Sequence, residues 1–301
     1  MTLPSRRTSA AIAFALAVAA VAFWWLTRPD PLPASAIPPR APDLANGEVL
    51  YHAGSCFACH KPPAGASQPS LPSGGTPFKT PIGTFYPQNI TPDAETGIGR
   101  WSASDFVNAM TRGLSPDGRH YFPAFPYMAY RAMPVADLVD LRGYLMSLPP
   151  VRSMAPTHAL PLLGLAHRGV GLWKRLAFAR APFAPAPGGS ESLRRGAYLV
   201  NAPGHCGECH TPRDWLMRED LARHMAGGPH PGGEGKVPSL RGLLAREKYE
   251  DAADLALALE HGEEFGYEDI SSGGMAAIQE NLAKLPPSDR AAIAEYLLSL
   301  K

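Results

Sequence analysis

The sequence has almost no excess charge: 28 Lys and Arg against 27 Asp and Glu leave a formal net charge of +1. It also has no run of basic residues interleaved with aromatics. Together these absences leave a role in nucleic-acid binding without support. Hydrophobic residues, by contrast, fill 45% of the 301 positions. That is enough for packed cores in a chain long enough for two domains of ordinary size.

Cysteine is scarce, and all four cysteines lie in two stretches of one pattern, CFACH at residues 56–60 and CGECH at residues 206–210. Neither stretch has a second Cys or His pair at the spacing of a zinc finger. A thioredoxin-like redox pair, the other alternative, needs no histidine after its second cysteine. The pattern therefore argues against both a zinc site and a dithiol redox site.

The Cys-x-x-Cys-His pattern is typical of covalent haem c attachment. On a helical turn the thiols fall at i and i+3 and the imidazole at i+4, so all three project from one face. The thiols would add across the two haem vinyl groups, and the histidine would give the iron its proximal nitrogen. The sequence thus predicts two covalently bound haem c groups, held by Cys56, Cys59 and His60 in the first stretch and by Cys206, Cys209 and His210 in the second.

Near the N-terminus, residues 8–26 are almost entirely apolar, which is about one bilayer thickness of helix. Arg6 and Arg7 ahead of the run favour a cytoplasmic N-terminus, and the Trp24-Trp25 pair suits the opposite interface. We expect residues 1–28 to anchor the chain in a bacterial cytoplasmic membrane, with the haem domains on the periplasmic side.

The alternative for residues 1–28 is a cleaved signal peptide, with Ala34-Ser35-Ala36 as the cleavage site. That triplet lies well beyond the apolar run, across a charged stretch that contains proline. We favour the uncleaved anchor. Both outcomes deliver the haem domains to the same compartment.

The rest of the chain divides by composition. Residues 29–43, rich in proline and alanine, are expected to form a semi-rigid spacer that lifts the first domain off the membrane. The first domain is expected at 44–150 and the second at 191–301. The connector, 151–190, is basic, apolar and proline-bearing. It is either a surface strap between domains or an amphipathic contact with a membrane or partner through residues 172–176.

Helical periodicity supports a repeat of one small unit. In the first domain we expect a short helix over residues 47–51, a helix over 101–110 that ends at Gly113, and a helix over 137–148 with a leucine stripe. In the second we expect a helix over 249–261 and a final helix capped by Ser288. The two final helices match at a shift of 152 positions, which indicates a tandem duplication.

Several longer stretches resemble the cytochrome c subunits of membrane-bound bacterial alcohol and gluconate dehydrogenases, and especially their diheme relatives. They are QNITPD at 88–93, GIG at 97–99 with Trp101, DGRH at 117–120, FPAFPY at 122–127, GLWK at 171–174 and GHCGECHTPR at 204–213. The resemblance implies an all-α fold: two tandem class I cytochrome c-like domains behind an N-terminal transmembrane anchor helix.

The chain departs from that family in three places. The alcohol dehydrogenase subunits have three haem motifs where this chain has two. Phe125 stands where their first domain often has Met, and the second domain keeps only VPSL at 237–240 in place of the NITPD stretch.

The sixth iron ligands are the least determined part of the site. A thioether is common there and favours reduced iron. For the second haem we favour Met275, where similar family members carry a Met, over Met217 and Met225. For the first haem we favour Met128, with Met133 or His120 as alternatives. Met133 sits against the start of the final helix, where packing explains it, and His120 would give a bis-histidine haem.

With the haem ligands assigned, no nucleophile, paired-carboxylate site or nucleotide loop stands out, so the chemistry belongs to the cofactor. We expect a membrane-tethered electron carrier rather than an enzyme, one that passes electrons from an exported dehydrogenase to a quinone, a cytochrome or a terminal oxidase. The alternative is a diheme enzyme such as a thiosulfate dehydrogenase or a cytochrome peroxidase. Thiosulfate dehydrogenases are similar to this chain in size. Their active haem typically has a cysteine as its distal ligand, which this chain cannot supply.

Overall fold

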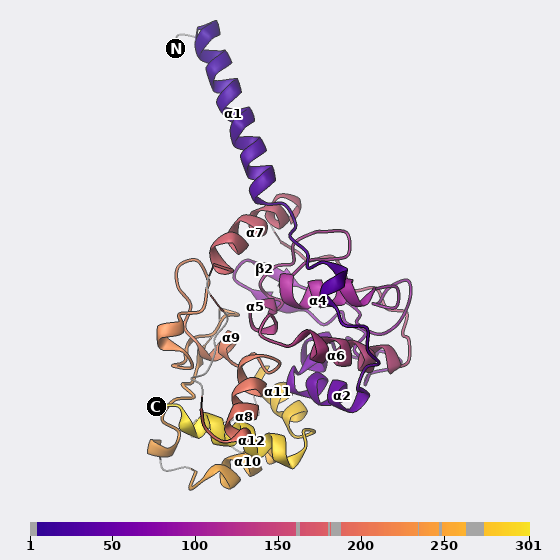
Figure 1. Cartoon of the computed structure of the whole chain (residues 1–301), viewed down its shortest axis with the longest axis vertical. Coiled ribbons are helices and arrows are strands. Elements are labelled where there is room, and N and C mark those ends of the chain that lie inside the picture. Colours follow the sequence, from indigo (N-terminus) through magenta and orange to yellow (C-terminus); the bar gives the residue numbers. More distant parts are fainter. Residues whose placement is uncertain are drawn as a thin grey trace.

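The computed structural model describes residues 5–160, 163–179, 181, 188–233, 235–246, 249–262 and 274–301. These residues form a helix-rich molecule from which one long N-terminal helix projects (Figure 1). The α-helices are α1 Arg6–Leu26, α2 Leu44–Ala53, α3 Cys56–His60, α4 Ala103–Arg112, α5 Tyr127–Tyr130, α6 Val135–Ser147, α7 Leu163–Ala177, α8 Glu191–Asn201, α9 Gly207–His210, α10 Ala252–His261, α11 Gly274–Leu282 and α12 Pro287–Ser299. Two small antiparallel hairpins pair β1 Phe78–Thr80 with β2 Gly83–Phe85, and β3 Gly228–Pro229 with β4 Lys236–Val237.

The same helix crossing occurs twice. In the first unit, which runs from α2 to α6, helix α2 packs against α6. In the second unit, which runs from α8 to α12, helix α8 packs against α12. Both crossings are close because a glycine lies at the contact: a Cβ on Gly47 would be 2.2 Å from the Asp140 carbonyl oxygen, and one on Gly196 would be 1.8 Å from that of Ala292. The two units therefore pack their first and last helices in the same way.

The helix ends follow local sequence signals. Ser102 and Asp105 form a reciprocal capping box at the start of α4, and Gly113 ends that helix with a φ of 56°. Asp251 caps α10, which Gly262 ends. The expected stripe on α6 is buried at Leu138, Leu141 and Leu145.

Several predicted boundaries need correction. Pro286, and not Ser288, is the cap residue of the last helix, which begins at Pro287. Proline at the first helical position loses no hydrogen bond, because the amide there has no partner within the helix. Helix α10 begins at Ala252 rather than at 249, since the Asp251 cap sets its start. Helix α2 is also longer than expected, because the Asp43 side chain caps it at Leu44.

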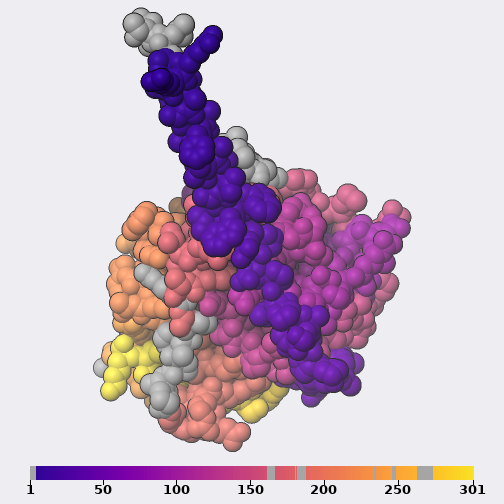
Figure 2. All heavy atoms as spheres, turned by 45° about the horizontal axis from the view of Figure 1, so that its top comes forward, coloured from indigo at the N-terminus to yellow at the C-terminus, as the bar shows by residue number. Residues whose placement is uncertain are grey.

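Residues 29–43 do not act as the expected spacer. They are extended apart from one short 3-10 turn, Ala34–Ala36, but they lie on the first unit. Leu32 donates its amide to Asn108 Oδ1 at 2.7 Å, and Arg40 forms an ion pair with the buried Asp140 at 2.9 Å. The space-filling view shows this indigo segment running as a strip across the surface below α1 (Figure 2). The chain therefore holds the first unit close to the foot of α1.

Helix α7, from the connector, crosses the foot of α1 (Figure 1). Three side chains bind the last carbonyls of α1: Arg175 Nε donates to Leu26 O at 3.0 Å, and His120 Nε2 and Arg168 reach Thr27 O at 2.9 and 3.4 Å. Cationic groups are favourable at a helix C-terminus, where free carbonyls concentrate negative charge. A Cβ on Gly171 would lie 2.7 Å from His120 Nε2 and 3.1 Å from the Thr27 carbonyl oxygen, so a larger residue there would have to displace the His120 ring.

Candidate functional site

The first Cys-x-x-Cys-His stretch forms the single turn α3, as its spacing predicts. Ser55 precedes it in the left-handed region with a φ of 45°, which turns the chain sharply out of α2. Cys56 is half-buried and Cys59 is exposed. His60 Nδ1 donates to the Gln88 carbonyl oxygen at 2.6 Å. That bond fixes the ring orientation and the tautomer, and leaves Nε2 with a lone pair for a metal.

The second stretch repeats this arrangement in α9, preceded by Cys206. His210 Nδ1 donates to the Pro238 carbonyl oxygen at 2.8 Å. His60 and His210 are 150 positions apart, and so are Gln88 and Pro238. The QNITPD and VPSL stretches therefore share one task in the two units, which is to orient the histidine.

Burial sets the protonation state of both triads. It lowers the pKa of His60 and of His210, which favours the neutral imidazole that a metal needs. It raises the pKa of Cys56 and of Cys206 to about 12. A dithiol redox centre or a zinc site depends on thiolates of lowered pKa. These neutral thiols beside an oriented imidazole fit thioether formation with a haem.

The two attachment segments lie next to each other, although 150 residues separate them. His205, which precedes Cys206, donates from Nε2 to the Gly54 carbonyl oxygen at 3.3 Å, and its ring meets that of Tyr130 with centroids 5.5 Å apart. Burial is the main cause of the raised pKa of Cys209, about 11, and the Cys59 thiol is close enough to contribute to it. No pattern in the sequence indicates this adjacency.

The two cores also interlock. Ala53 belongs to the apolar cluster of the second unit, and Ala202 belongs to that of the first. Helix α11 packs against both α2 and α3. The described residues around the two motifs are therefore held by both units at once.

Met275 lies in the first turn of α11, half-buried against the same apolar cluster that contacts Cys206. Of the two alternatives, Met217 is 54% exposed. Met225 is fully buried in the apolar cluster of the second unit, and its amide donates to Thr211 Oγ1 next to His210.

The candidates for the first haem lie in different surroundings. Met133 is 4% exposed in the apolar cluster that contacts Cys56 and Phe57. Met128, the residue that the sequence favours, lines a small cavity with second-unit side chains that include His205 and Glu219. The structure thus brings Met133, and not Met128, into one cluster with the first attachment segment.

Both ring nitrogens of His120 are engaged away from the attachment segments. Nε2 donates to Thr27 O, and Nδ1 accepts from Lys174 Nζ at 3.2 Å. Lys174 also donates to the carbonyl oxygens of Arg112 and Gly113, and lies 4.7 Å from the centre of the Tyr127 ring. His120 is therefore part of the junction between α1, α7 and the first unit.

A cluster of charges surrounds the second motif. Arg213 pairs with Glu208. Burial and the Glu208 carboxylate raise the pKa of Glu219 to about 7. Glu219 shares its small cavity with His205 and His224. The sequence gives neither histidine a spacing partner that would mark it, yet both lie in the interior between the units.

No family model matches the chain. A search of characterised proteins finds a protein named "Diheme cytochrome c-type" from Cereibacter sphaeroides, 37% identical over 293 residues, which are 97% of each chain. The chain belongs to the diheme c-type cytochromes. Two covalently bound haem c groups are thereby established as its cofactors, and the oriented histidines and the paired thiols are the side chains that fit them.

Other relatives are cytochrome subunits of dehydrogenases. The cytochrome is 35% identical to the "Gluconate 2-dehydrogenase cytochrome c subunit" of Pantoea cypripedii over 85% of its own length and 59% of the relative. It is 32% identical to the "Fructose dehydrogenase cytochrome subunit" of Gluconobacter japonicus over 90% of its own length and 54% of that protein. It therefore spans little more than half of each of these two relatives. The expected resemblance to dehydrogenase cytochrome subunits is confirmed, and it supports electron transfer.

Proposed function

We propose that this cytochrome is a membrane-tethered electron carrier that takes electrons singly from an exported dehydrogenase and passes them to a quinone, another cytochrome or a terminal oxidase. The adjacency of the two attachment segments carries the proposal, because two one-electron cofactors attached side by side can exchange electrons directly. The haems supply the redox chemistry. The chain's own residues hold them, orient the proximal imidazoles and exclude water.

We further propose that residues 44–150 and 191–301 are two tandem class I cytochrome c-like domains. The repeated glycine crossing of first and last helix and the repeated histidine–carbonyl bond support this division. Because each apolar cluster includes a residue of the other domain, we expect the two domains to move as one rigid body.

For the sixth ligands we propose Met275 on the second haem and Met133 on the first. Each belongs to the apolar surroundings of the matching attachment segment. Met128 and His120 remain the competing candidates for the first haem, and variants of all three residues distinguish them.

The membrane tether rests on α1, which is long and apolar enough to cross a bilayer and whose described side chains make no buried contact. The arginine pair before α1 and the tryptophan pair at its end support a periplasmic position for everything after residue 28. A native chain beginning at Ile37 would instead establish a cleaved signal.

The carrier function is tested with the full-length protein expressed with a cytochrome c maturation system. We expect two covalent haems per chain, retention in membranes washed with high salt, and reduction of both haems by a co-expressed dehydrogenase and its substrate. Zinc in place of haem would contradict the haem assignment. Haems that exchange no electrons with any dehydrogenase or membrane acceptor would contradict the carrier function.

The enzyme alternative makes the opposite prediction for small ligands. A carrier with both sixth positions closed should bind carbon monoxide weakly at both reduced haems. Stoichiometric binding to the unaltered protein, or turnover of thiosulfate or peroxide, would favour a diheme enzyme.

A further inference from the structure

A group of exposed apolar side chains spans the foot of α1, helix α7 and the loop that Trp173 of α7 holds. Trp24 and Trp25 end the helix, and the other members come from α7 and from the loop after α9. We call this group the anchor-side face; its members outside α1 are Leu172, Leu176, Trp215 and Met217. Trp215 is 87% exposed and Leu176 is 50% exposed. Single exposed apolar residues are common on soluble proteins, but a largely exposed tryptophan beside further exposed apolar groups indicates a contact surface.

The parts of this face are fixed to one another. Trp173 on α7 donates its indole N–H to the Leu216 carbonyl oxygen at 2.7 Å, which joins the loop to α7. Arg175 on the same helix donates to the Leu26 carbonyl oxygen, which joins α7 to α1. The loop, α7 and the foot of α1 therefore keep their relative positions.

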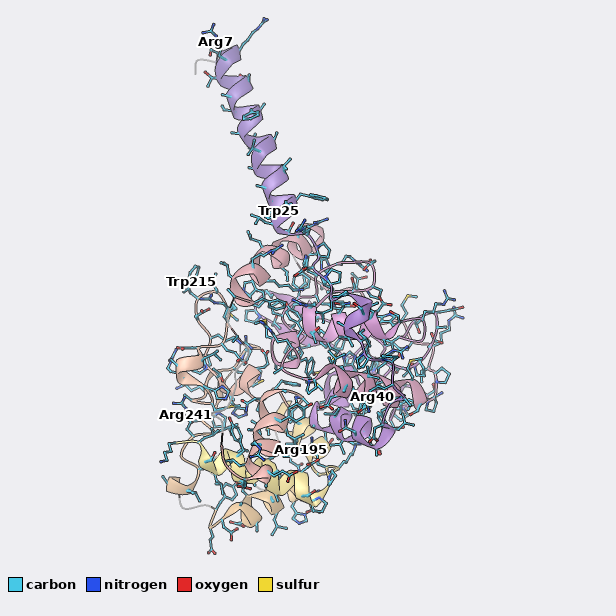
Figure 3. All side chains as sticks on the ribbon, in the orientation of Figure 1. Arg7, Trp25, Arg40, Arg195, Trp215 and Arg241 are labelled. Carbon is cyan, nitrogen blue, oxygen red and sulfur yellow. The ribbon has the colours of Figure 1, made fainter. Side chains whose placement is uncertain are left out.

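The face also lies at the right level. Trp25 and Trp215 are both at the end of the globular part from which α1 projects, and α7 runs across that end (Figure 3). If α1 spans a bilayer, Trp25 marks the depth of the headgroups, because tryptophan prefers that boundary. The side chains on α7 and in the loop then face the same boundary.

Charge at this end suits lipid as well. The Arg28 guanidinium lies 5.0 Å from the centre of the Trp25 ring, and Arg168 and Arg175 lie along α7. Aromatic and apolar groups beside cations are typical of segments that lie in the membrane interface, since the apolar parts enter the acyl boundary while the cations meet lipid phosphates.

We propose that the anchor-side face rests on the lipid surface, with Leu172, Leu176, Trp215 and Met217 inserted beside α1 at the headgroup boundary. The partner is the bilayer itself, and α7 is a monotopic contact that adds to the transmembrane anchor. This inference rests on the proposed membrane tether. Continuity with α1 argues for lipid over a protein partner, because nothing but bilayer surrounds a transmembrane helix at that level in the isolated chain.

The test uses the full-length holoprotein in liposomes of phosphatidylcholine with phosphatidylglycerol. A phospholipid carrying a diazirine near its headgroup is activated by light, and the labelled residues are located by mass spectrometry. We expect label on α1, on residues 172–176 and on residues 215–217. Leu44 and Leu257 are exposed apolar residues of α2 and α10, two helices that lie away from the foot of α1 (Figure 1); they are internal controls and should stay unlabelled.

The labelling outcomes distinguish the lipid contact of the anchor-side face from the α1 tether on which it depends. Label on α1 without label on the face would overturn this inference and leave the tether in place. Absence of label on α1 would overturn both. Label on the face in liposomes that is lost in native membranes would assign the face to a protein partner and also overturn the inference.

A variant with Leu172, Leu176 and Trp215 all changed to serine provides a second measurement. We expect its label at the face to fall at least fivefold while the label on α1 and the haem spectrum stay unchanged. The matched control changes Leu44 and Leu257 to serine and should leave the labelling pattern as in the wild type. Equal labelling at the face in the triple variant and the wild type would show that the apolar side chains do not insert.

Discussion

At the scale of single residues, the sequence and the structure favour different residues as the sixth iron ligand of the first haem. Counting positions back from the final helix favours Met128, whereas the apolar cluster around Cys56 contains Met133. Ligation by a thioether favours ferrous iron, so its loss lowers the potential. The two assignments therefore predict that different Met→Ala variants change the spectrum and the potential of the first haem.

We predict that Met133→Ala opens the first haem alone, lowers its potential and abolishes its weak long-wavelength thioether-to-iron band. Met128→Ala should leave the spectrum unchanged and cost only packing energy. Met110→Ala, which removes a buried Met of α4 from the same cluster, is the matched packing control and should cost about 2–5 kcal/mol of unfolding free energy with no spectral change. Redox titration of each variant measures the outcome. A lost band in Met128→Ala would return the ligand to Met128, and loss of the low-spin spectrum in His120→Ala would indicate a bis-histidine haem.

Glu219 is predicted to make stability depend on pH. Its pKa is raised from 4.5 to about 7 in the folded protein by burial and by Glu208. A group with a raised folded pKa contributes stability that is fully present below its unfolded pKa, near 4.5, and is lost as the pH rises through about 7. Glu219→Gln should remove this part of the decline. Thermal unfolding of the holoprotein between pH 4.5 and 8 measures it.

The control for that experiment is Glu280→Gln, at an exposed position on α11. It should keep the wild-type decline between pH 4.5 and 7. An identical decline in Glu219→Gln and the wild type would show that Glu219 does not titrate in this range.

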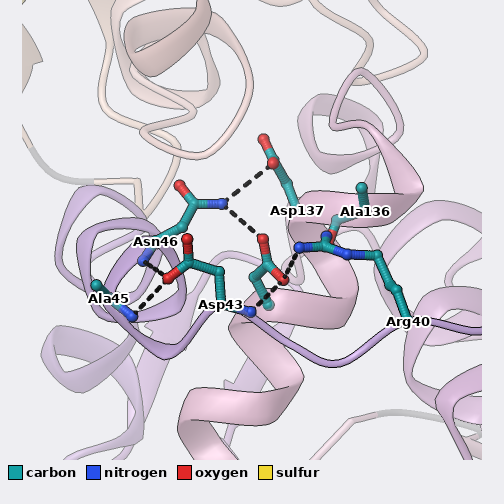
Figure 4. A network of polar contacts seen from close by, with 7 residues as sticks. Arg40, Asp43, Ala45, Asn46, Ala136 and Asp137 are labelled. Carbon is teal, nitrogen blue, oxygen red and sulfur yellow. Dashed lines mark hydrogen bonds and ion pairs between the residues drawn. The ribbon is translucent and has the colours of Figure 1, made fainter.

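At the scale of elements, the segment before α2 is fastened to α6 by one buried carboxylate. Asp140 accepts from the amide of Asp43 at 2.8 Å and from Asn46 Nδ2 at 2.9 Å, and pairs with Arg40 (Figure 4). Asp43 in turn caps α2 through the amides of Ala45 and Asn46. Asp140 thus holds Asp43 in place, and Asp43 fixes the start of α2, the helix that leads into α3.

We predict that Asp140→Ala lowers the unfolding free energy by about 2–3 kcal/mol. The Asp43 amide loses its acceptor and Arg40 loses its carboxylate partner, while Asn46 and Arg40 keep their bonds to Asp137 and to the Ala136 carbonyl oxygen. Asp30→Ala is the control, since Asp30 is 79% exposed and 4.0 Å from its partner Arg112, and should change stability by less than about 1 kcal/mol. Chemical denaturation followed by the haem absorption gives both values. Equal losses in the two variants would refute a special role for Asp140.

The sequence predicted elements better than their contacts. Capping residues and leucine spacing placed α4, α6 and α10 to within a few residues, because those signals act within one or two turns. The contacts of Asp140, and the bond between His205 and Gly54, join residues about one hundred or more positions apart, and neither end carries a distinctive pattern. The bond from His210 to Pro238 could have been found, because VPSL occupies the place of QNITPD at the 150-residue shift.

At the scale of the whole molecule, the two haem units are similar in plan but not independent. Ala53 of the first unit lies in the apolar cluster of the second, and Ala202 of the second unit lies in that of the first. Helix α11 packs against α3. A change in the packing of one unit therefore reaches the boundary of the other.

We predict that changing Cys206 and Cys209 to Ala halves the covalent haem per chain and leaves the first haem attached, because its own thiols and histidine are intact. The mirror variant, with Cys56 and Cys59 changed to Ala, should retain the second haem in the same way. Pyridine haemochrome assay of purified protein counts the haems. Loss of both haems in either variant would mean that attachment at one site requires the other.

The three bonds that hold the last carbonyls of α1 have a consequence for encounters between this cytochrome and its partners. A globular part on a flexible linker would rotate freely and could meet reaction partners from any direction. If α1 spans a bilayer as proposed, the bonds from His120, Arg168 and Arg175 to the carbonyls at its foot hold the globular part at a fixed tilt and height. Partners in the same membrane would then always meet the same side of the cytochrome, and diffusible partners would have to approach from the side away from the bilayer.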